Sequence, residues 1–506
     1  MSTIDALLAY TTRASPDHVA LTLREHDMSY RDLSAAVERL ASRLSTDIAP
    51  GQRVAIVVPN VPALVIGMFA TWHLGGVAVP LNARYREYEL RRILQDAQPT
   101  LVISVTSYRG YPFAELLPTL LPHLPTVRRC VFVDSMGEVE GEVQGVGAGQ
   151  DAALAETHDP EIGLILYTSG STGAPKGALI KHMSEVEGAR AMNDVLGATP
   201  EDVCIFVIPL SHAFGLMCFI ATVASGGHAV LVESTFSSEP VADALRRHSA
   251  TILHGPPALF TSLLKSDPAC LGPVRTGYVA GAPCPPQVLE QLDTANCRIL
   301  NLYGMTEIGA ATCCRADDSP GVRYTTVGRP LPGYELRIVN SEVQVRGPYV
   351  TTGYYRQPEQ TAAAFDDGWL RTGDRGSMDA QGNLSIAGRA KDMICVAGLS
   401  VFPAEVESFL LTHPDVVQAA IVGVPHASMG EVLQAFIVAR PGSNLTPTML
   451  LQFARARIAG YKLPYAIRMV SELPMLAAGK PDRVALAQMI QEETYADPHA
   501  SKHPAL

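Results

Sequence analysis

The chain has 506 residues, a length that predicts at least two compact domains with large cores. Apolar residues make up 47% and charged residues 18% of the sequence, the balance of a folded globular protein rather than a disordered one. The formal net charge of -11 argues against a nucleic-acid partner, because binding to phosphate backbones is driven by clustered Lys and Arg. Any anionic ligand must therefore be bound by local groups.

Nothing in the sequence predicts stable membrane insertion or secretion. The first residues, MSTIDALLAYTTRASPD, lack the basic head, apolar core and small-residue cleavage site of a secretion signal. The longest apolar stretch, residues 61–81, is interrupted by Pro62, His73 and a Gly-Gly pair, which favours a buried helix followed by a buried strand. The nine cysteines show no C-x-x-C spacing and are expected to be reduced core residues. These features together predict a cytoplasmic protein.

Up to about residue 330, short β-branched or apolar runs alternate with longer stretches of helical character. The clearest runs are QRVAIVVPN, GLILYTSG, VCIFVIPLS, HAVLVE, ATILHGPP, GYVAGAPC and RILNLYG. This alternation predicts largely parallel, doubly wound sheets covered by helices. Ligands of such sheets gather at the carboxyl ends of the strands, where the glycine-bearing turns fall.

The pattern changes after Gly328. YELRIVNSEVQVRGP has two alternating runs around Asn340-Ser341, and GSMDAQGNLSIAG has a turn near Asp379, so a small antiparallel sheet or barrel is expected. The last hundred or so residues mix strands with helices, one opened by Pro403 and one capped by Thr446. The predicted fold class is therefore α/β, with a large N-terminal domain of doubly wound sheets, a small β-barrel-like subdomain and a small α+β C-terminal domain.

The stretch LYTSGSTGAPKG, residues 166–177, carries the strongest local signal. It is not a nucleotide-triphosphatase phosphate loop, because Ala174 and Pro175 separate Gly173 from Lys176. A serine-nucleophile elbow is also excluded, because no serine here has the G-x-S-x-G spacing. Backbone N–H groups, several hydroxyls and one ammonium remain, and such donors suit the phosphates of a nucleotide. A Gly/Ser-rich surface turn is the alternative for this stretch taken alone.

Further motifs decide between these alternatives. They follow in the order PLSHAFGL at 209–216, GAPC at 281–284, NLYGMTE at 301–307, GYY at 353–355, WLRTGD at 369–374, GRAKDMI at 388–394 and GK at 479–480. Together with the loop, they resemble the landmarks of the adenylate-forming superfamily of acyl-CoA synthetases, nonribosomal adenylation domains and luciferases. The resemblance covers nearly the whole chain.

The resemblance implies a two-step reaction carried out by two domains. Residues 1–390 are expected to bind ATP and the acid, and residues 391–506 to form a mobile domain that swings about a hinge at Lys391. In one orientation Lys480 contacts the α-phosphate and the substrate carboxylate, and in the other the loop around Gly398 receives coenzyme A.

By the same resemblance, Glu307 and Thr168 are the expected Mg²⁺ ligands, Asp374 binds the ribose, and Arg389 reaches the ribose or phosphates. Tyr303 and the backbone after Ala280 should sandwich the adenine. His212 is expected to gate the acyl channel, with a buried, hydrogen-bonded histidine as the alternative. The expected cofactor-binding residues are Thr168, Ser169, Gly170, Ser171, Thr172, Gly173, Lys176, Gly281, Ala282, Pro283, Tyr303, Gly304, Met305, Thr306, Asp374, Arg389, Gly398 and Leu399.

The expected acyl pocket contains small or apolar residues and no Arg or Lys, with His254 as its one polar candidate. This lining predicts a small-molecule carboxylic acid with a long or bulky hydrophobic acyl group rather than a dicarboxylate such as malonate. The pocket residues are Ala213, Phe214, Gly215, His254, Ala280, Ile308, Gly309 and Ala310.

The function that follows is ATP-dependent acyl-CoA ligation through an acyl-adenylate. Four departures from the family pattern leave open an imbalance between the two half-reactions. They are Ala397 in place of a second glycine, Arg375 after TGD, Pro481 after the catalytic lysine, and a hairpin at Asn340 without the usual longer Gly-rich turn. The alternatives are transfer to a carrier protein's phosphopantetheine arm, thiolation of a supplied acyl-adenylate only, and a non-catalytic sensor. The presence of Lys480 and Glu307 argues against the last.

Overall fold

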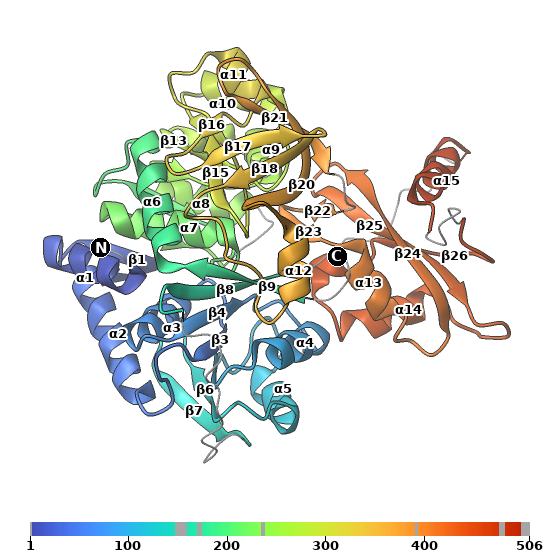
Figure 1. The fold of residues 1–506 in the computed structure, drawn as a ribbon, viewed down its shortest axis with the longest axis horizontal. Coiled ribbons are helices and arrows are strands. Elements are labelled where there is room, and N and C mark those ends of the chain that lie inside the picture. The colour runs from blue at the N-terminus through green and yellow to red at the C-terminus, as the bar shows by residue number, and fades with distance from the viewer. Residues whose placement is uncertain are drawn as a thin grey trace. The chain divides into compact units, whose positions relative to one another are not determined.

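The computed structural model describes residues 3–146, 159–169, 175–233, 238–389, 393–474 and 481–496 (Figure 1). The chain divides into two compact units. The first comprises residues 1–85, 90–168 and 175–390, and the second comprises residues 86–89, 169–174 and 391–506.

The first unit contains a seven-stranded sheet in the order β7-β6-β5-β3-β4-β8-β9. The pairs β3–β4, β3–β5, β4–β8 and β5–β6 are parallel, and β7 adds an antiparallel edge to β6. Its strands are β3 (Arg53–Val57), β4 (Val77–Leu81), β5 (Leu101–Ser104), β6 (Arg129–Val133), β7 (Val139–Gln144), β8 (Ile162–Ser169) and β9 (Pro175–Lys181).

A nine-stranded sheet of the same unit has the order β16-β15-β14-β13-β12-β10-β11-β1-β2. Its central strands are parallel, and the edge pairs β1–β2, β14–β15 and β15–β16 are antiparallel. The prediction of doubly wound, largely parallel sheets is confirmed. The strands are β1 (Val19–Leu23), β2 (His26–Ser29), β10 (Val203–Phe206), β11 (His228–Leu231), β12 (Ile252–Leu253), β13 (Thr276–Val279), β14 (Arg298–Met305), β15 (Gly309–Cys313) and β16 (Arg329–Pro330).

Helices connect these strands, and several begin with the proline that suits a first helical turn. The helices up to residue 390 are α1 (Ile4–Ala14), α2 (Tyr30–Leu44), α3 (Pro62–His73), α4 (Glu87–Ala97), α5 (Phe113–Leu120), α6 (His182–Leu196), α7 (Ala213–Ser225), α8 (Ser238–Arg247), α9 (Pro257–Ser266), α10 (Pro286–Thr294), α11 (Pro320–Thr325) and α12 (Pro358–Ala364), with the 3₁₀ turns η1 (Leu121–His123) and η2 (Pro268–Leu271).

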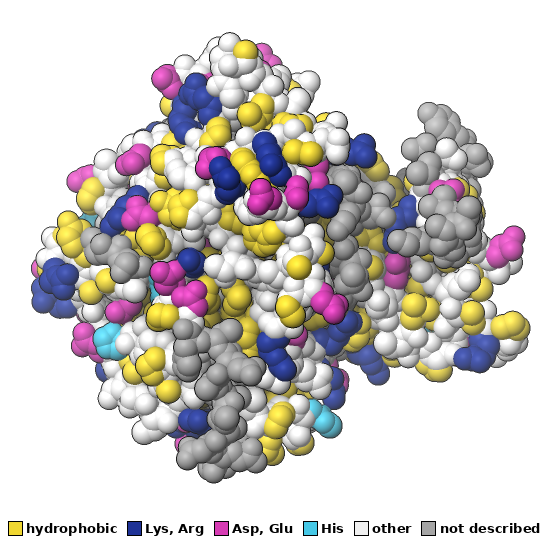
Figure 2. Space-filling model, in the orientation of Figure 1, with side chains coloured by type: hydrophobic (Ala, Val, Ile, Leu, Met, Phe, Trp, Pro, Cys, Tyr) yellow, Lys and Arg dark blue, Asp and Glu magenta, His cyan; other side chains and the backbone are white. Residues whose placement is uncertain are grey.

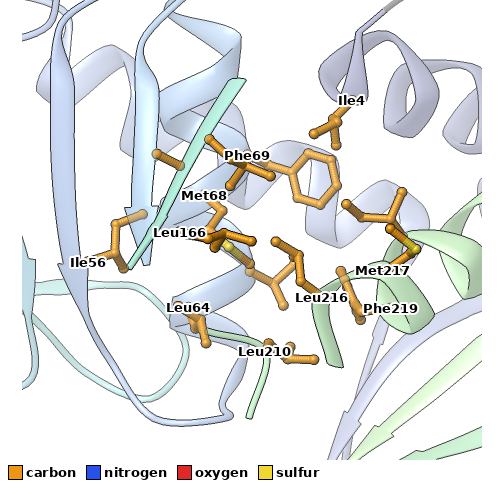
Figure 3. Packing of buried hydrophobic residues seen from close by; sticks show 14 of the residues in the cluster. Ile4, Ile56, Leu64, Met68, Phe69, Leu166, Leu210, Leu216, Met217 and Phe219 are labelled. Carbon is orange, nitrogen blue, oxygen red and sulfur yellow. The ribbon is translucent and has the colours of Figure 1, made fainter. Parts of the chain in front are cut away.

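Helices α3 and α7 are apolar almost all round and lie in the largest core. Residues 62–72 of α3 and residues 215–223 of α7 are buried. Figure 3 shows Phe69 of α3 near Leu216 and Met217 of α7, with Ile56 of β3 in the same cluster. As predicted for residues 61–81, the apolar stretch forms a buried helix followed by the buried strand β4. No helix within the described ranges is long and apolar enough to cross a membrane.

A five-stranded antiparallel sheet follows, in the order β17-β18-β20-β19 with β21 paired to β20. The hairpin turn predicted at Asn340-Ser341 is present, and both residues have positive φ, as a two-residue type I′ turn requires. In Figure 2 acidic and basic side chains are interspersed on the visible face. The strands are β17 (Glu335–Val339), β18 (Glu342–Arg346), β19 (Phe365–Asp366), β20 (Trp369–Met378) and β21 (Leu384–Arg389).

The second unit is α+β, as predicted. Its sheet has the order β23-β22-β25-β24, and β26 pairs with β25. Thr446 caps α14 by accepting a hydrogen bond from the Met449 N–H at 3.2 Å, in agreement with the sequence pattern. The elements are β22 (Ile394–Val396), β23 (Leu399–Val401), α13 (Pro403–Leu410), β24 (Val416–His426), β25 (Gly430–Ala439), α14 (Pro447–Arg455), η3 (Gly460–Lys462), β26 (Ala466–Met469) and α15 (Arg483–Ala496).

The β22–β23 turn places a non-glycine residue in a left-handed conformation. Val396 pairs with Leu399, so Ala397 and Gly398 form a two-residue turn with φ values of 50° and 85°. Both residues of a type I′ turn need positive φ, which costs an alanine roughly 1–2 kcal/mol. The alanine methyl at this position therefore strains the turn.

We expect the substitution Ala397→Gly to stabilise the second unit by about 0.5–1 kcal/mol, because relief of the left-handed strain exceeds the extra entropy of an unfolded glycine. Calorimetry on the full chain measures the change. Ala487→Gly, the same chemical change inside helix α15, is the matched control and should destabilise by a similar amount. A loss of stability in Ala397→Gly would contradict the strain.

Candidate active site

The predicted motifs lie directly after strands of the two large sheets. LYTS forms the end of β8, PLSHAFG follows β10, GAPC follows β13, and YGM forms the end of β14. The carboxyl ends of parallel strands meet at one edge of a sheet, which is where α/β proteins bind ligands. The predicted loop residues Gly170, Ser171, Thr172 and Gly173 lie outside the described residues, as does the side chain of Ser169.

Tyr303 and Asp374 form a buried pair at the predicted nucleoside end of the site. The Tyr303 hydroxyl, at the end of β14, donates a hydrogen bond to Oδ2 of Asp374 on β20 at 2.7 Å. Both residues are less than 10% exposed, and the Asp374 N–H donates to the Thr372 hydroxyl at 3.1 Å. A hydrogen bond to an ionised carboxylate is stronger than one between neutral groups. The pair therefore fixes the tyrosine ring and the carboxylate relative to each other.

A second tyrosine orients the predicted metal ligand, Glu307. Its Oε1 accepts a hydrogen bond from the Tyr354 hydroxyl at 2.8 Å, and its backbone oxygen accepts one from the Thr351 N–H at 2.7 Å. Burial and the nearby Glu307 charge raise the pKa of Tyr354, so this hydroxyl stays protonated and donates.

The predicted phosphate-binding lysine lies at the same tyrosine. The Lys176 ammonium lies 5.0 Å from the centre of the Tyr354 ring, within the range of a cation–π contact. Lys176 is on β9, next to Gly177, whose carbonyl accepts the Tyr355 N–H at 2.8 Å. Tyr354 therefore contacts both a carboxylate and an ammonium. Glu307 follows β14 of the nine-stranded sheet, and Lys176 lies on β9 of the seven-stranded sheet.

The turn between β14 and β15 has no room for larger residues. A Cβ at Gly304 would lie 2.0 Å from the Gly309 carbonyl oxygen, and Gly309 has φ of 59°. Met305 and Thr306 lie in this hairpin, between Tyr303, which is bonded to Asp374, and Glu307. Gly304, predicted at the nucleotide, and Gly309, predicted in the pocket, therefore lie on one hairpin.

The segment expected to cover the adenine follows β13. Ala280 is buried and donates its N–H to the Gly255 carbonyl at 3.3 Å, and Gly281 has φ of 85°. Gly281 and Pro283 are exposed, and Ala282 is half-buried. This backbone is accessible, as a partner for a planar ring must be.

His212 is the N-cap of α7. Its Nδ1 accepts the Phe214 N–H at 3.3 Å, and burial of the half-buried ring lowers its pKa. The ring is therefore neutral and is held at the N-terminus of α7, the helix that carries Ala213, Phe214 and Gly215. Its role as a gate stays a prediction.

His254 is buried and contacts two aromatic rings. Its ring stacks on that of Tyr278 with centres 5.4 Å apart, and it lies edge to face with Phe214 at 6.4 Å. Nδ1 accepts the Tyr278 N–H at 3.1 Å, and burial lowers the pKa of the ring to about 3. His254 also lines a cavity between α6 and α7 with room for about one water molecule. At neutral pH it therefore offers a neutral nitrogen and no positive charge.

The remaining pocket residues are small or apolar, as expected. Ile308 and Ala310 are fully buried, and the Ile308 carbonyl accepts the Tyr334 hydroxyl at 2.5 Å. Within the second unit, Gly398 lies in the strained β22–β23 turn, and Leu399 is the first residue of β23. Lys480 and Lys391 lie outside the described residues, and so does the Arg389 side chain.

The described side chains fit one Mg²⁺ shared with a substrate. Among them there is no group of three or more His, Cys, Asp or Glu that would hold a metal by itself. Mg²⁺ at phosphate-transfer sites is usually bound by one or two carboxylates together with substrate phosphates and water. Glu307 supplies one such carboxylate, and Thr168 is half-buried near the end of β8.

Sequence reasoning did not assign a role to Tyr354, although GYY was one of the motifs used. The structure shows that its hydroxyl orients Glu307 and that its ring contacts Lys176. The spacing of this motif along the chain gave no indication of either partner. Each contact joins residues far apart in sequence.

Comparison with known proteins agrees with this architecture. The chain matches the AMP-binding enzyme family over residues 8–355 and the AMP-binding enzyme C-terminal domain over residues 405–480. It is 35% identical over 504 residues to the 3-[(3aS,4S,7aS)-7a-methyl-1,5-dioxo-octahydro-1H-inden-4-yl]propanoyl:CoA ligase of Mycobacterium tuberculosis, covering 97% of this chain and 99% of that protein. The ligase of the same name from Rhodococcus jostii is 32% identical over 491 residues, covering 93% and 94%.

Solved structures show the same fold. A double mutant of the o-succinylbenzoate CoA synthetase of Bacillus subtilis has a TM-score of 0.81 to this chain at 27% identity, covering 95% of this chain and 98% of that one. Two doubly wound sheets followed along the chain by a small α+β unit are the architecture of the adenylate-forming enzymes.

The chain belongs to the AMP-binding enzyme family. The assignment to the AMP-forming acid–thiol ligases made from its motifs, which use ATP and coenzyme A, is confirmed by these relatives. The relatives themselves are named as ligases of small-molecule carboxylic acids.

The buried His254 predicts a pH-dependent contribution to stability. Its pKa is about 3 in the folded chain and near its ordinary value of 6.5 when unfolded, so the unfolded state binds the proton first as the pH falls. From pH 6.5 downward this group alone should lower the free energy of unfolding by up to about 1.4 kcal/mol per pH unit.

We therefore expect the variant His254→Asn, whose side-chain oxygen can still accept the Tyr278 N–H, to lose less stability than the wild type between pH 7 and pH 5. Urea unfolding at both pH values measures the difference. His123→Asn, on an exposed side chain, is the control and should leave the profile unchanged. Parallel profiles for His254→Asn and the wild type would show that His254 is accessible to protons in the folded chain.

Proposed function

We propose that this chain activates a bulky, largely apolar carboxylic acid as its acyl-adenylate and then transfers the acyl group to coenzyme A. One observation carries the proposal. The β14–β15 hairpin holds Tyr303 and Glu307, each hydrogen-bonded to a partner across the site, while Gly309 and Ala310 of the same hairpin belong to an apolar lining. A nucleotide and an acyl group bound at this hairpin would be neighbours.

In the first step, a carboxylate oxygen of the acid attacks the α-phosphorus of ATP, and the bond to pyrophosphate breaks. The products are the acyl-adenylate and pyrophosphate. Phosphoryl-transfer chemistry needs positioned positive charge more than acid–base groups. We assign Lys176 to the outer phosphates, with the hydroxyls of residues 168–172, and Lys480 to the α-phosphate and the substrate carboxylate.

Asp374 fits the ribose hydroxyls, because a carboxylate can accept several hydrogen bonds and Tyr303 fixes the orientation of this one. Glu307, with Thr168, would hold Mg²⁺, which neutralises phosphate charge when bound. Tyr354 keeps the Glu307 carboxylate in one orientation before the nucleotide arrives.

In the second step, the thiolate of coenzyme A attacks the carbonyl carbon of the adenylate, and AMP leaves. We assign the entry of the thiol to the turn at Gly398 and Leu399, brought to the site by rotation about Lys391. The strain at Ala397 supports a distinct conformational task for this turn, because backbone strain often accompanies function.

The acid is proposed to resemble those named for the relatives, a propanoic acid carried on a methylated bicyclic ring. The expected lining has no Arg or Lys, and its one titratable candidate, His254, is neutral at physiological pH. A second carboxylate would therefore find no cation there. A ring system instead contacts apolar residues such as Phe214 and Ile308.

We expect purified protein with Mg-ATP and coenzyme A to release pyrophosphate and form a thioester from alicyclic or aryl propanoic acids, and to leave malonate and succinate untouched. Pyrophosphate and acyl-CoA are measured in parallel across the panel. A dicarboxylate as the best substrate would contradict the proposal. Pyrophosphate without thioester would move the acceptor to a carrier protein, tested by replacing coenzyme A with a holo carrier protein.

The variant Lys480→Ala separates the two steps. We expect a loss of at least about 100-fold in pyrophosphate release, the usual effect of removing a group that stabilises transition-state charge, while thioester formation from a synthetic acyl-adenylate falls only a few-fold. Lys265→Ala, on the exposed end of α9, is the control and should change neither rate. Equal losses in both steps would contradict the assignment of Lys480 to the first step alone.

A further inference from the structure

Helices α6 and α7 pack against each other and against β15 at a point where two glycines leave room. A Cβ at Gly309 would lie 2.7 Å from the terminal methyl of Met217, and a Cβ at Gly188 would lie 3.6 Å from it. Met217, shown in Figure 3, is only 4% exposed. The space left by both glycines is thus filled by one thioether side chain, which is unbranched and can adopt several conformations.

Glu185 lies three residues before Gly188 on α6, and therefore on the same face of the helix. It is 2% exposed, and its Oε2 has no hydrogen-bond partner among the described residues. It lies close enough to two side chains, Cys218 of α7 and Tyr334, to influence their pKa values when it is ionised. The Glu185 carboxyl therefore faces the interior between α6, α7 and the β14–β15 hairpin.

Tyr334 places this carboxyl next to the expected acyl pocket. Its hydroxyl lies 3.3 Å from the Cβ position of Gly309 and donates to the carbonyl of Ile308. Gly309 and Ile308 are both expected pocket residues. Met217 lies between Gly309 and Gly188 of α6, so a shift of its side chain would open the Gly309 side of the pocket toward α6, the helix that carries Glu185.

A buried carboxyl oxygen without a hydrogen-bond partner destabilises the folded chain, and a leucine at this position would avoid that penalty. The penalty is larger when the carboxyl is charged. Burial raises the pKa of Glu185 to about 8, so that at neutral pH the side chain is mostly an uncharged acid with one O–H donor. Oε2 of Glu185 has no hydrogen-bond partner among the described residues, so a proton on this oxygen is available to a ligand.

We infer that Glu185 is a specificity-determining residue that donates a hydrogen bond to a carbonyl or hydroxyl oxygen at the end of the acid remote from its carboxylate. The Met217 side chain moves aside when that end of the acid enters. The inference rests on the proposed function and adds to it a polar requirement deep in an apolar pocket. A purely hydrocarbon acid would leave the Glu185 carboxyl unpaired, and its binding would be weaker.

The test compares two acids that differ at one position: a propanoic acid on a bicyclic ring with a ring ketone, and the analogue with a methylene there. We expect wild-type kcat/KM for pyrophosphate release at pH 7 to favour the ketone about tenfold or more. Glu185→Leu should remove this preference by losing activity on the ketone alone. Glu185→Gln, which keeps an N–H donor, should retain part of the preference.

Glu187→Leu is the matched control, because Glu187 lies on the same helix but is paired with Arg190 and partly exposed. It should leave the preference for the ketone unchanged. Unchanged preference in a folded Glu185→Leu variant, or no preference in the wild type, would overturn the inference. No product from any acid would instead count against the proposed function.

A pH series gives a readout that a structural role would not move. Above about pH 8 an ionised Glu185 cannot donate, so the wild-type preference for the ketone should fall, while that of Glu185→Gln should not. Cys218 and Tyr334, the titratable side chains known to interact with Glu185 in the described chain, have raised pKa values and stay neutral in this range. Matching pH profiles for wild type and Glu185→Gln would overturn the inference even if Glu185→Leu does not fold.

Discussion

The first unit depends on one layer of apolar helices. Helix α3 packs on β3 and β4 of the seven-stranded sheet, α7 packs on β10, β11, β14 and β15 of the nine-stranded sheet, and both belong to one continuous core. Interiors packed at this density resist small displacements. The segment of residues 351–355 joins the two sheets a second time, because Thr351 bonds to Glu307 and Tyr355 to Gly177. Residues from different sheets therefore keep fixed positions at the site.

The two carboxylates of the site are held in the same way. Asp374 and Glu307 are both buried, and each accepts a hydrogen bond from a tyrosine hydroxyl, Tyr303 and Tyr354 respectively. The tyrosines also present their rings, one to the expected adenine position and one to Lys176. Each aromatic residue thus combines a polar function with a contact surface, which reduces the reorganisation needed when a nucleotide binds.

Turns, helix caps and buried stretches could be predicted from the residues within a short segment of the sequence. The turns at Asn340 and near Asp379, the Thr446 cap and the buried stretch from Pro62 were all confirmed, because periodicity and turn residues determine them. The site residues came from the resemblance, since no single motif indicates its partners. Glu185 shows the limit, because α6 carries several acidic residues and only tertiary packing decides which one is buried.

The buried thiols affect how this enzyme can be studied. Burial raises the pKa of eight of the nine cysteines, for example to about 12 for Cys130 and Cys297 and about 11 for Cys314. The thiolate is the form that reacts with colorimetric disulfide reagents and alkylating agents, so these side chains react slowly while the chain is folded. Such a reagent, added to samples withdrawn from the reaction, can measure the coenzyme A that remains with little background from these side chains, and a sudden rise in reactive thiols would report unfolding.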